Sequence, residues 1–141
     1  MPALKGSLKG IWHYVAEPAI GIANSDKKTR FDYAKEHGEM SEDGYQFAIL
    51  NEKTKNLKRG FKWGLELEDG GYTSNLVEKL GFLNKCYQAD EMTQDQYEGT
   101  VAQILKDLEE FHVMTAISDD EYRDTLATIQ GQVMGAKGFA R

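Results

Sequence analysis

Apolar positions with helical spacing dominate the second half of the chain. Leucine, isoleucine, valine and aromatic residues recur three or four positions apart in three separate stretches. This spacing places them on one face of an α-helix. Because the links at 89–92 and 114–117 are short, we expect neighbouring helices to run antiparallel. The three stripes consist of Leu76, Leu80, Leu83 and Tyr87; of Tyr97, Val101, Ile104, Leu105, Leu108 and Phe111; and of Tyr122, Leu126, Ile129 and Val133.

One short pattern occurs three times and predicts three helix starts. Each copy holds an apolar residue, a hydroxyl residue, acidic or amide residues, and then tyrosine. The hydroxyl residue is the expected N-cap, and the apolar residue and the tyrosine can close a hydrophobic staple. Gln96 and Glu121 stand at the third helical position, where they complete a capping box. Thr73 or Ser74 is expected to cap a further helix. The three copies lie at 40–45, 92–97 and 117–122.

The first half of the chain predicts two helices with a weaker pattern. One covers 25–36 and ends at Gly38, because glycine readily adopts the left-handed conformation that terminates helices. The other begins at Glu42, directly after the first copy of the capping pattern, and ends at Gly60.

Two segments lack a helical period. Over 61–73, Leu65 and Leu67 alternate with glutamates, which favours a short strand or an extended link. Residues 1–24 hold both prolines of the chain and several glycines. We expect this segment to form short strands or an extended arm.

The predicted fold is therefore mainly α, with about five helices. The last three are expected to form an antiparallel helical bundle, and the N-terminus an extended arm or a small β element. In domain terms, 1–24 is the arm or the short strands, 25–134 is the helical domain, and 135–141 is a tail.

Two sections of the helical region share a further pattern, in which leucines precede an acidic and polar run that ends in tyrosine. Over 76–129 this pattern resembles the SHOCT domain, a short bacterial helical hairpin. The turn glycine of that module is missing in both copies, where Asp90 and Ala116 stand nearby. The resemblance implies an oligomerisation or docking role. It is carried by Leu76, Leu80 and Leu83 before 91–97, and by 105–108 before 117–122.

Charge is unevenly placed along the chain. The 141 residues carry a net charge of −6, but 1–63 sum to +3 and 64–141 to −9. This polarity allows steering of a charged partner or head-to-tail self-association. Cys86 is the one cysteine and favours a reducing compartment. No apolar run approaches the length of a membrane span, and the N-terminus does not resemble a signal peptide. We expect a cytoplasmic protein, or one packaged into an assembly that is built in the cytoplasm, with no membrane contact.

Metal, cofactor and catalytic sites find little support in the sequence. Glu109 and His112 have the Glu-x-x-His spacing of di-iron bundles, but such a site needs a second copy of the motif, which the chain lacks. The other histidines, His13 and His37, have no cysteines at zinc spacing. We therefore expect no cofactor, no metal and no catalytic residues.

The segment 53–63 is the most basic part of the chain. It holds five lysines and arginines, with two aromatic residues interleaved. This combination suits contact with single-stranded nucleic acid or phosphate, for which Lys58, Arg59 and Trp63 are the candidates. The alternative is a solvated helix end followed by core aromatics.

Two further groups are candidate partner contacts. Trp12 and Tyr14 stand among glycines and can anchor the arm in a partner, or fold back onto the chain's own helices. Asp119 and Asp120 can contact a basic protein surface, although their place in a helix first turn also explains them.

The preferred interpretation is a non-catalytic protein–protein interaction or assembly protein, for example a structural or accessory component of a phage or another large complex. A protein partner is expected and a homo-oligomer is compatible with the sequence. Two alternatives stay open. One is a small acidic inhibitor or regulator that binds a larger protein. The other is a nucleic-acid accessory protein that uses the basic segment 53–63.

Overall fold

The computed structural model describes residues 31–62 and 71–139. These residues form four long helices, preceded by a short helical segment at 31–36. No strand occurs within the two described ranges. The expectation of a mainly helical fold is confirmed, whereas the expected arm or small β element at 1–24 lies outside the described residues. The helices are α3 (Glu42–Lys62), α4 (Gly71–Gln88), α5 (Gln94–Val113) and α6 (Asp119–Phe139).

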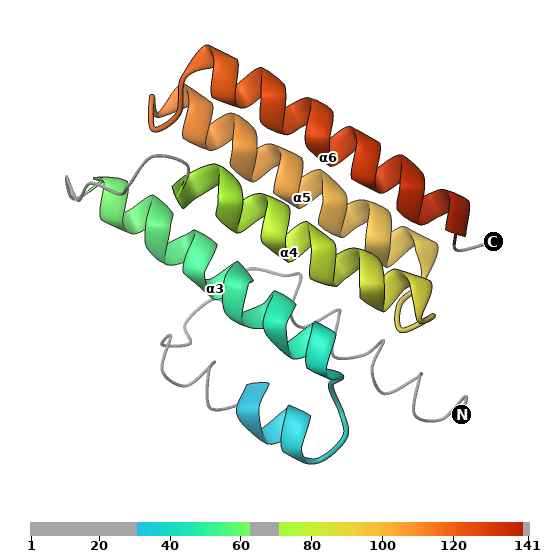
Figure 1. The fold of residues 1–141 in the computed structure, drawn as a ribbon. Helices are drawn as coiled ribbons and strands as arrows, with labels where there is room; N and C mark the ends of the chain where they lie inside the picture. The colour runs from blue at the N-terminus through green and yellow to red at the C-terminus, as the bar shows by residue number, and fades with distance from the viewer. Residues whose placement is uncertain (1–30, 63–70, 140–141) are drawn as a thin grey trace.

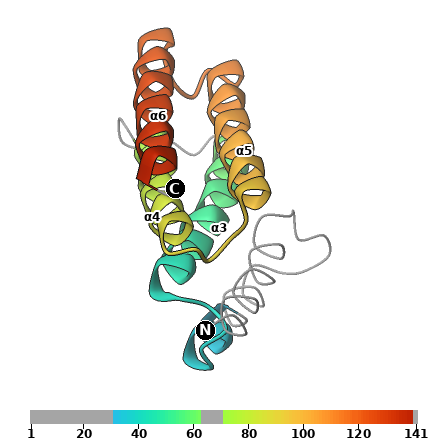
Figure 2. The same ribbon diagram turned by 90° about the vertical axis from the view of Figure 1, so that its right-hand side faces the viewer.

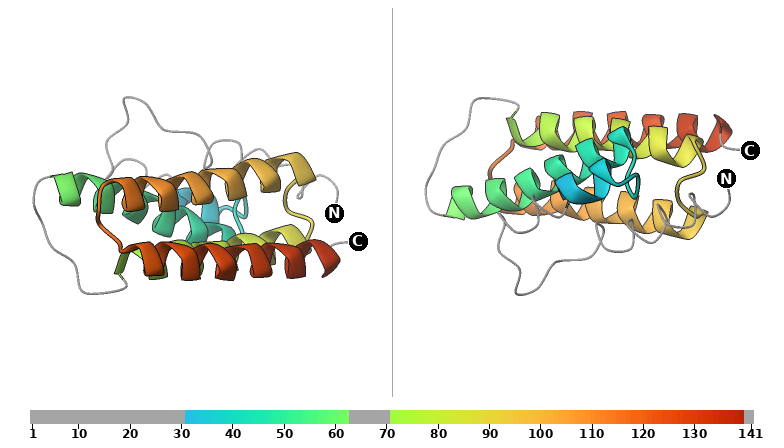
Figure 3. Two further views of the ribbon diagram at one scale, coloured as in Figure 1. Left: turned by 90° about the horizontal axis from the view of Figure 1, so that it is seen from above. Right: turned by 90° about the horizontal axis from the view of Figure 1, so that it is seen from below.

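Consecutive helices run antiparallel and form a bundle (Figure 1). Helix α4 is the central member, because it packs against α3, α5 and α6. The view turned by 90° shows α5 and α6 side by side, with α4 beneath α6 (Figure 2). Seen from below, α3 lies obliquely between α4 and α5 (Figure 3). The expected bundle of the last three helices is therefore confirmed, and α3 joins it as a further member.

The three repeated sequence patterns are helix starts. The hydroxyls of Ser41, Thr93 and Ser118 each accept a hydrogen bond from the backbone N–H three residues later, at 3.0, 3.1 and 3.1 Å. At Thr93 the capping box is complete, because the side chain of Gln96 accepts from the Thr93 backbone N–H at 3.0 Å. Side-chain capping satisfies N–H groups that have no partner within the helix. The apolar residues before the caps are all buried: Met40, Met92 and Ile117.

Three helix ends share one backbone motif. The residue just beyond each helix is left-handed, with φ of +73° at Gly38, +61° at Asp90 and +62° at Thr115. The N–H of the following residue then donates to the carbonyl five residues earlier, at 2.8 to 3.0 Å. This is the Schellman arrangement, which satisfies the last carbonyls of a helix. The predicted terminator Gly38 is correct, whereas the other two ends place non-glycine residues in the conformation that glycine favours.

The link between α3 and α4 differs from its prediction. Helix α3 continues through Gly60, and α4 begins at Gly71 rather than after a cap at 73 or 74. Tertiary contacts lie at this point: the ring centroids of Phe61 and Tyr72 are 6.1 Å apart in a T-shaped arrangement, and those of Tyr72 and Phe111 are 4.9 Å apart. A glycine in a helix interior costs only about 1 kcal/mol. We infer that these aromatic contacts outweigh this cost. The proposed strand positions Leu65 and Leu67 lie outside the described residues.

The core fills the space between the four helices. Helix α6 runs through the glycines of the expected tail to Phe139, and Ala136 within it is 2% exposed. Each of the three predicted stripes contributes buried side chains. The largest fully buried apolar ones are Phe47, Leu76, Leu80, Leu83, Tyr97, Ile104, Leu108, Phe111 and Ile129.

Candidate functional site

A cluster of buried polar side chains interrupts the apolar core where α3, α4 and α5 meet. We call it the polar cluster. Four of its side chains are at most 4% exposed, and the fifth, Lys58, is 20% exposed. Burying charged groups is costly unless they are paired and hydrogen-bonded. The cluster consists of Thr54 and Lys58 from α3, Asn75 and Lys79 from α4, and Asp107 from α5.

Lys79 occupies the centre of the polar cluster. Its Nζ donates to Thr54 Oγ1 at 2.9 Å and to Asn51 Oδ1 at 3.0 Å, both on α3. On the opposite side it lies 3.3 Å from Asp107 Oδ2 on α5. An ammonium group has three donors. All three are therefore used, and a single side chain of α4 links both neighbouring helices.

Asp107 is shared between two lysines. Its Oδ1 accepts from Lys58 Nζ at 2.5 Å and from Gln103 Nε2 at 3.0 Å, while Oδ2 faces Lys79. Lys58 also lies 3.2 Å from Glu110, whose side chain is 41% exposed. The buried part of the cluster thus sets one carboxylate against two ammonium groups.

Asn75 and Thr54 complete the arrangement by binding the backbone of α3. Asn75 Nδ2 donates to the carbonyl of Leu50 at 3.1 Å. The Thr54 hydroxyl lies 3.0 Å from the same carbonyl and 2.5 Å from Asn75 Oδ1. Of these two neutral side chains, Thr54 accepts a hydrogen bond from Lys79 Nζ, and Asn75 contacts Thr54.

Burial weakens proton binding by the Lys79 amine. Loss of hydration lowers the pKa of this amine to about 8, although the Asp107 carboxylate acts in the opposite direction. A lysine with a lowered pKa is a possible nucleophile. However, the Lys79 side chain is 0% exposed, so no substrate atom reaches its Nζ in this conformation. In this conformation the cluster links α3, α4 and α5 through side-chain contacts.

The predicted basic candidates separate in the structure. Lys58 points into the polar cluster, whereas Arg59 is exposed and hydrogen-bonds Asn56 at 2.5 Å. Trp63 lies outside the described residues. The two charges are neighbours on α3 but have different surroundings, and a role in phosphate contact stays a prediction.

The acidic candidates lie at the start of α6 and are both partnered. Asp119 Oδ1 is 2.6 Å from His112 Nε2, and Asp120 is 2.7 Å from Arg123. The His112 contact lowers the pKa of Asp119. The ring of His112 also stacks on that of Tyr122, with the ring centroids 4.4 Å apart. These groups therefore join the end of α5 to the start of α6. Contact with a partner remains a prediction for both aspartates. The arm candidates Trp12 and Tyr14 lie outside the described residues.

Sequence reasoning missed most of the polar cluster, although a signal was present. Lys79 stands three positions after Leu76, and Asp107 stands three after Ile104 and four before Phe111. These are core-facing positions of the predicted stripes. A charged residue within an apolar stripe is the observation that identifies such a site.

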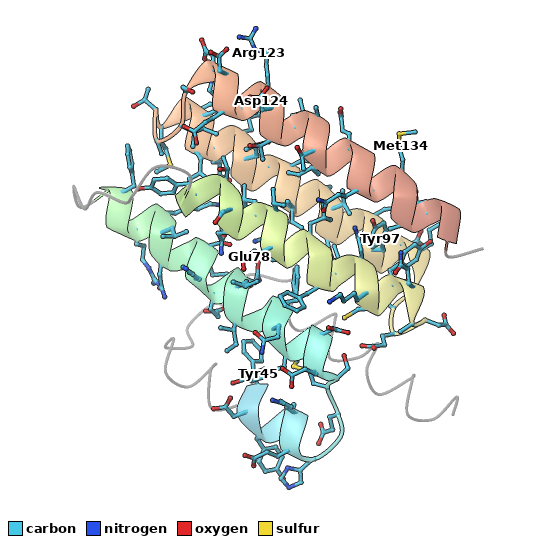
Figure 4. All side chains as sticks on the ribbon, viewed as in Figure 1. Tyr45, Glu78, Tyr97, Arg123, Asp124 and Met134 are labelled. Atoms are coloured by element: carbon cyan, nitrogen blue, oxygen red, sulfur yellow. The ribbon has the colours of Figure 1, made fainter. Side chains whose placement is uncertain are left out.

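The outer face of α6 is the second unusual feature. Met134 is 74% exposed, and Met134, Arg123 and Asp124 project away from the bundle (Figure 4). Gly131 and Gly135 are exposed on the same helix. A Cβ added at either glycine meets nothing within 4 Å in the part of the chain that the structure describes, beyond its own helix backbone. The packing of residues 31–62 and 71–139 therefore does not require glycine there.

A shallow apolar groove runs between α5 and α6, beside this face. The ion pair between Lys137 and Glu98, at 3.0 Å, joins the two helices across it. Its lining residues are Tyr97, Glu98, Val101, Ala102, Leu105, Val133 and Lys137.

Two further features concern residues 31–62 and 71–139, which the structure describes. No group of three or more histidine, cysteine, aspartate or glutamate side chains there could hold a metal ion. None of these helices has both the length and the apolarity that crossing a bilayer requires. In comparisons with known proteins, no family model, no curated protein and no solved structure matches the chain.

Proposed function

We propose that this chain is a non-catalytic interaction and assembly protein, and that the outer face of α6 contacts a second copy of the chain. The observation that carries the proposal is the exposure of Met134, at 74%, on a helix that packs on α4 and α5 with its opposite side. Burying this side chain in a contact would remove apolar surface from water, which is favourable.

The glycines beside Met134 support a helix as the partner. Glycine is among the least favourable residues in a helix interior, at about 1 kcal/mol relative to alanine. Among the described residues, a Cβ at Gly131 or Gly135 would meet nothing within 4 Å outside its own helix backbone, so packing there does not explain this cost. The distance between packed helix axes depends on the side chains at the contact, so small residues permit close approach.

Charge placement supports an antiparallel pair of α6 helices. The first turn of α6 carries Asp119, Asp120 and Glu121, and the last turn carries Lys137. Antiparallel packing brings the acidic end of one copy towards the basic end of the other, and it also pairs opposite helix dipoles. A two-fold interface of this kind uses the same surface on both copies.

The state of the reactive side chains is consistent with a non-catalytic role. Lys79 and Cys86 are both 0% exposed, and burial raises the pKa of the Cys86 thiol. A buried, protonated thiol is a poor nucleophile.

The test is sedimentation of the full chain over a range of concentrations, comparing the wild type with Met134→Glu. We expect the wild type to dimerise and Met134→Glu to remain monomeric with its helicity intact. Ser74→Glu is the matched control, since it adds the same charge at an exposed position on α4 and should leave the dimer unchanged. A wild type that stays monomeric at every concentration, or a dimer that tolerates Met134→Glu, would overturn the proposal.

A further inference from the structure

Helix α3 is joined to the rest of the bundle differently from α6. The middle of the α3 interface is polar: Thr54 and Lys58 face Lys79 and Asp107. By contrast, the inner face of α6 contributes Ile129 at 0% and Ala136 at 2% exposure. The polar cluster therefore lies entirely on one side of α4, where α3 docks.

The charges of the polar cluster are balanced by a single buried group. Lys58 and Lys79 both face Asp107, and the other acid near Lys58 is the half-exposed Glu110. Lys55 of α3 is a further nearby cation that disfavours the charge on Lys79, although it is itself paired with Glu52 at 3.1 Å. Without the negative charge of Asp107, the docked state would hold two ammonium groups close together with little compensation.

Undocking of α3 would relieve this conflict directly. With α3 removed, Lys79 and Asp107 would face water, and hydration would replace the lost hydrogen bonds. Ions are costly to bury and cheap to hydrate. Loss of the Asp107 charge thus shifts the balance towards the undocked state specifically, and does not merely weaken the packing of the whole bundle.

We propose that Lys58, Lys79 and Asp107 form a charge-dependent latch, which holds α3 on the unit formed by α4, α5 and α6 and which releases α3 as a whole when the carboxylate charge of Asp107 is lost. Release uncovers the side chains of Phe47 and Ala48 on α3, which are 1% and 0% exposed in the docked state. The latch thereby controls access to an apolar surface that is distinct from the outer face of α6. It does not depend on the proposed dimer.

Hydrogen exchange of the native full chain, followed by mass spectrometry, tests the latch. In Asp107→Asn, amide exchange throughout α3 should accelerate by at least about 100-fold, because removal of one partner leaves buried charge uncompensated. Exchange in α5 and α6 should change far less. The matched control is Glu110→Gln, which removes the more exposed partner of Lys58 and should accelerate α3 by less than about 5-fold.

A second variant covers the case in which Asp107→Asn fails to fold. Lys79→Met combined with Asp107→Asn removes both buried charges and keeps similar side-chain volumes, so α3 should exchange no faster than in the wild type. Equal acceleration of all four helices in Asp107→Asn would overturn the latch, as would unchanged exchange of α3. Faster exchange of α3 in the double variant would overturn it as well.

Discussion

The Nζ atom of Lys79 lies 3.3 Å from Oδ2 of Asp107, and their side chains are 0% and 4% exposed. Such a pair adds little to stability compared with apolar residues of the same size. It does restrict geometry, since sliding α4 past α5 by one turn would separate the charges. We therefore expect the pair to select one register of the bundle rather than to strengthen it, a role that is established for single polar groups in helical assemblies.

The stability of the protein should depend on the protonation of Lys79. Its pKa is lowered from 10.5 to about 8, so the unfolded chain binds the proton more tightly than the folded one. The contribution of Lys79 to the free energy of unfolding should therefore rise between pH 8 and 10.5, by on the order of 3 kcal/mol. It is lost again as the pH falls through 8. Urea unfolding at several pH values, compared between the wild type and Lys79→Met, isolates this contribution. A difference that stays constant across this window would contradict the assignment.

The titration of Cys86 should affect the free energy of unfolding in the opposite direction to that of Lys79. Burial raises the pKa of its thiol above the ordinary 9.0, so the folded chain keeps a proton that the unfolded chain releases. The contribution of Cys86 is complete below pH 9 and should decline as the pH rises further. As the pH rises above 9, the free energy of unfolding should therefore fall less in Cys86→Ala than in the wild type. The same decline in both proteins would show that Cys86 is not its source.

Helix starts could be predicted from the sequence because their causes are local. The hydroxyl cap, the apolar residue before it and the following acids lie within six residues of each other. These groups satisfy the first backbone N–H groups without help from distant parts of the chain. The end of α3 could not be predicted in the same way. It depends on Phe61 meeting Tyr72, a contact between two helices that the local pattern does not contain.

The polar cluster needed the tertiary structure for a similar reason. Lys79 lies 25 residues from Thr54 and 28 from Asp107. The stripes show that Lys79 and Asp107 face the core, but not that they face each other. That relation depends on the register between α4 and α5, which the sequence pattern leaves undetermined.

Thr115 should be a site of backbone strain. Its φ is +62°, a conformation that is unfavourable for β-branched residues. Thr115→Gly should raise the free energy of unfolding by about 1 kcal/mol, measured by urea unfolding. Ala89→Gly, in the turn between α4 and α5, is the control. It should destabilise the protein, because residue 89 is not among the positive-φ positions. Destabilisation by Thr115→Gly would show that contacts of the threonine side chain outweigh the strain.

The glycines of α6 separate the stability of the fold from its association. Since a Cβ at Gly131 or Gly135 meets nothing within 4 Å in the described part of the chain, apart from its own helix backbone, Gly131→Ala and Gly135→Ala should each stabilise the folded monomer. The expected gain is up to about 1 kcal/mol per site, because alanine is the better helix former. Dilute samples unfolded with urea report this gain, and sedimentation at high concentration reports association. If the outer face of α6 packs closely against a second copy, the same variants should weaken the dimer, because each added methyl group separates the helices. If the variants are more stable but associate more weakly, the two glycines serve a contact between copies of the chain. Greater stability with unchanged association would mean that the glycines serve no interface.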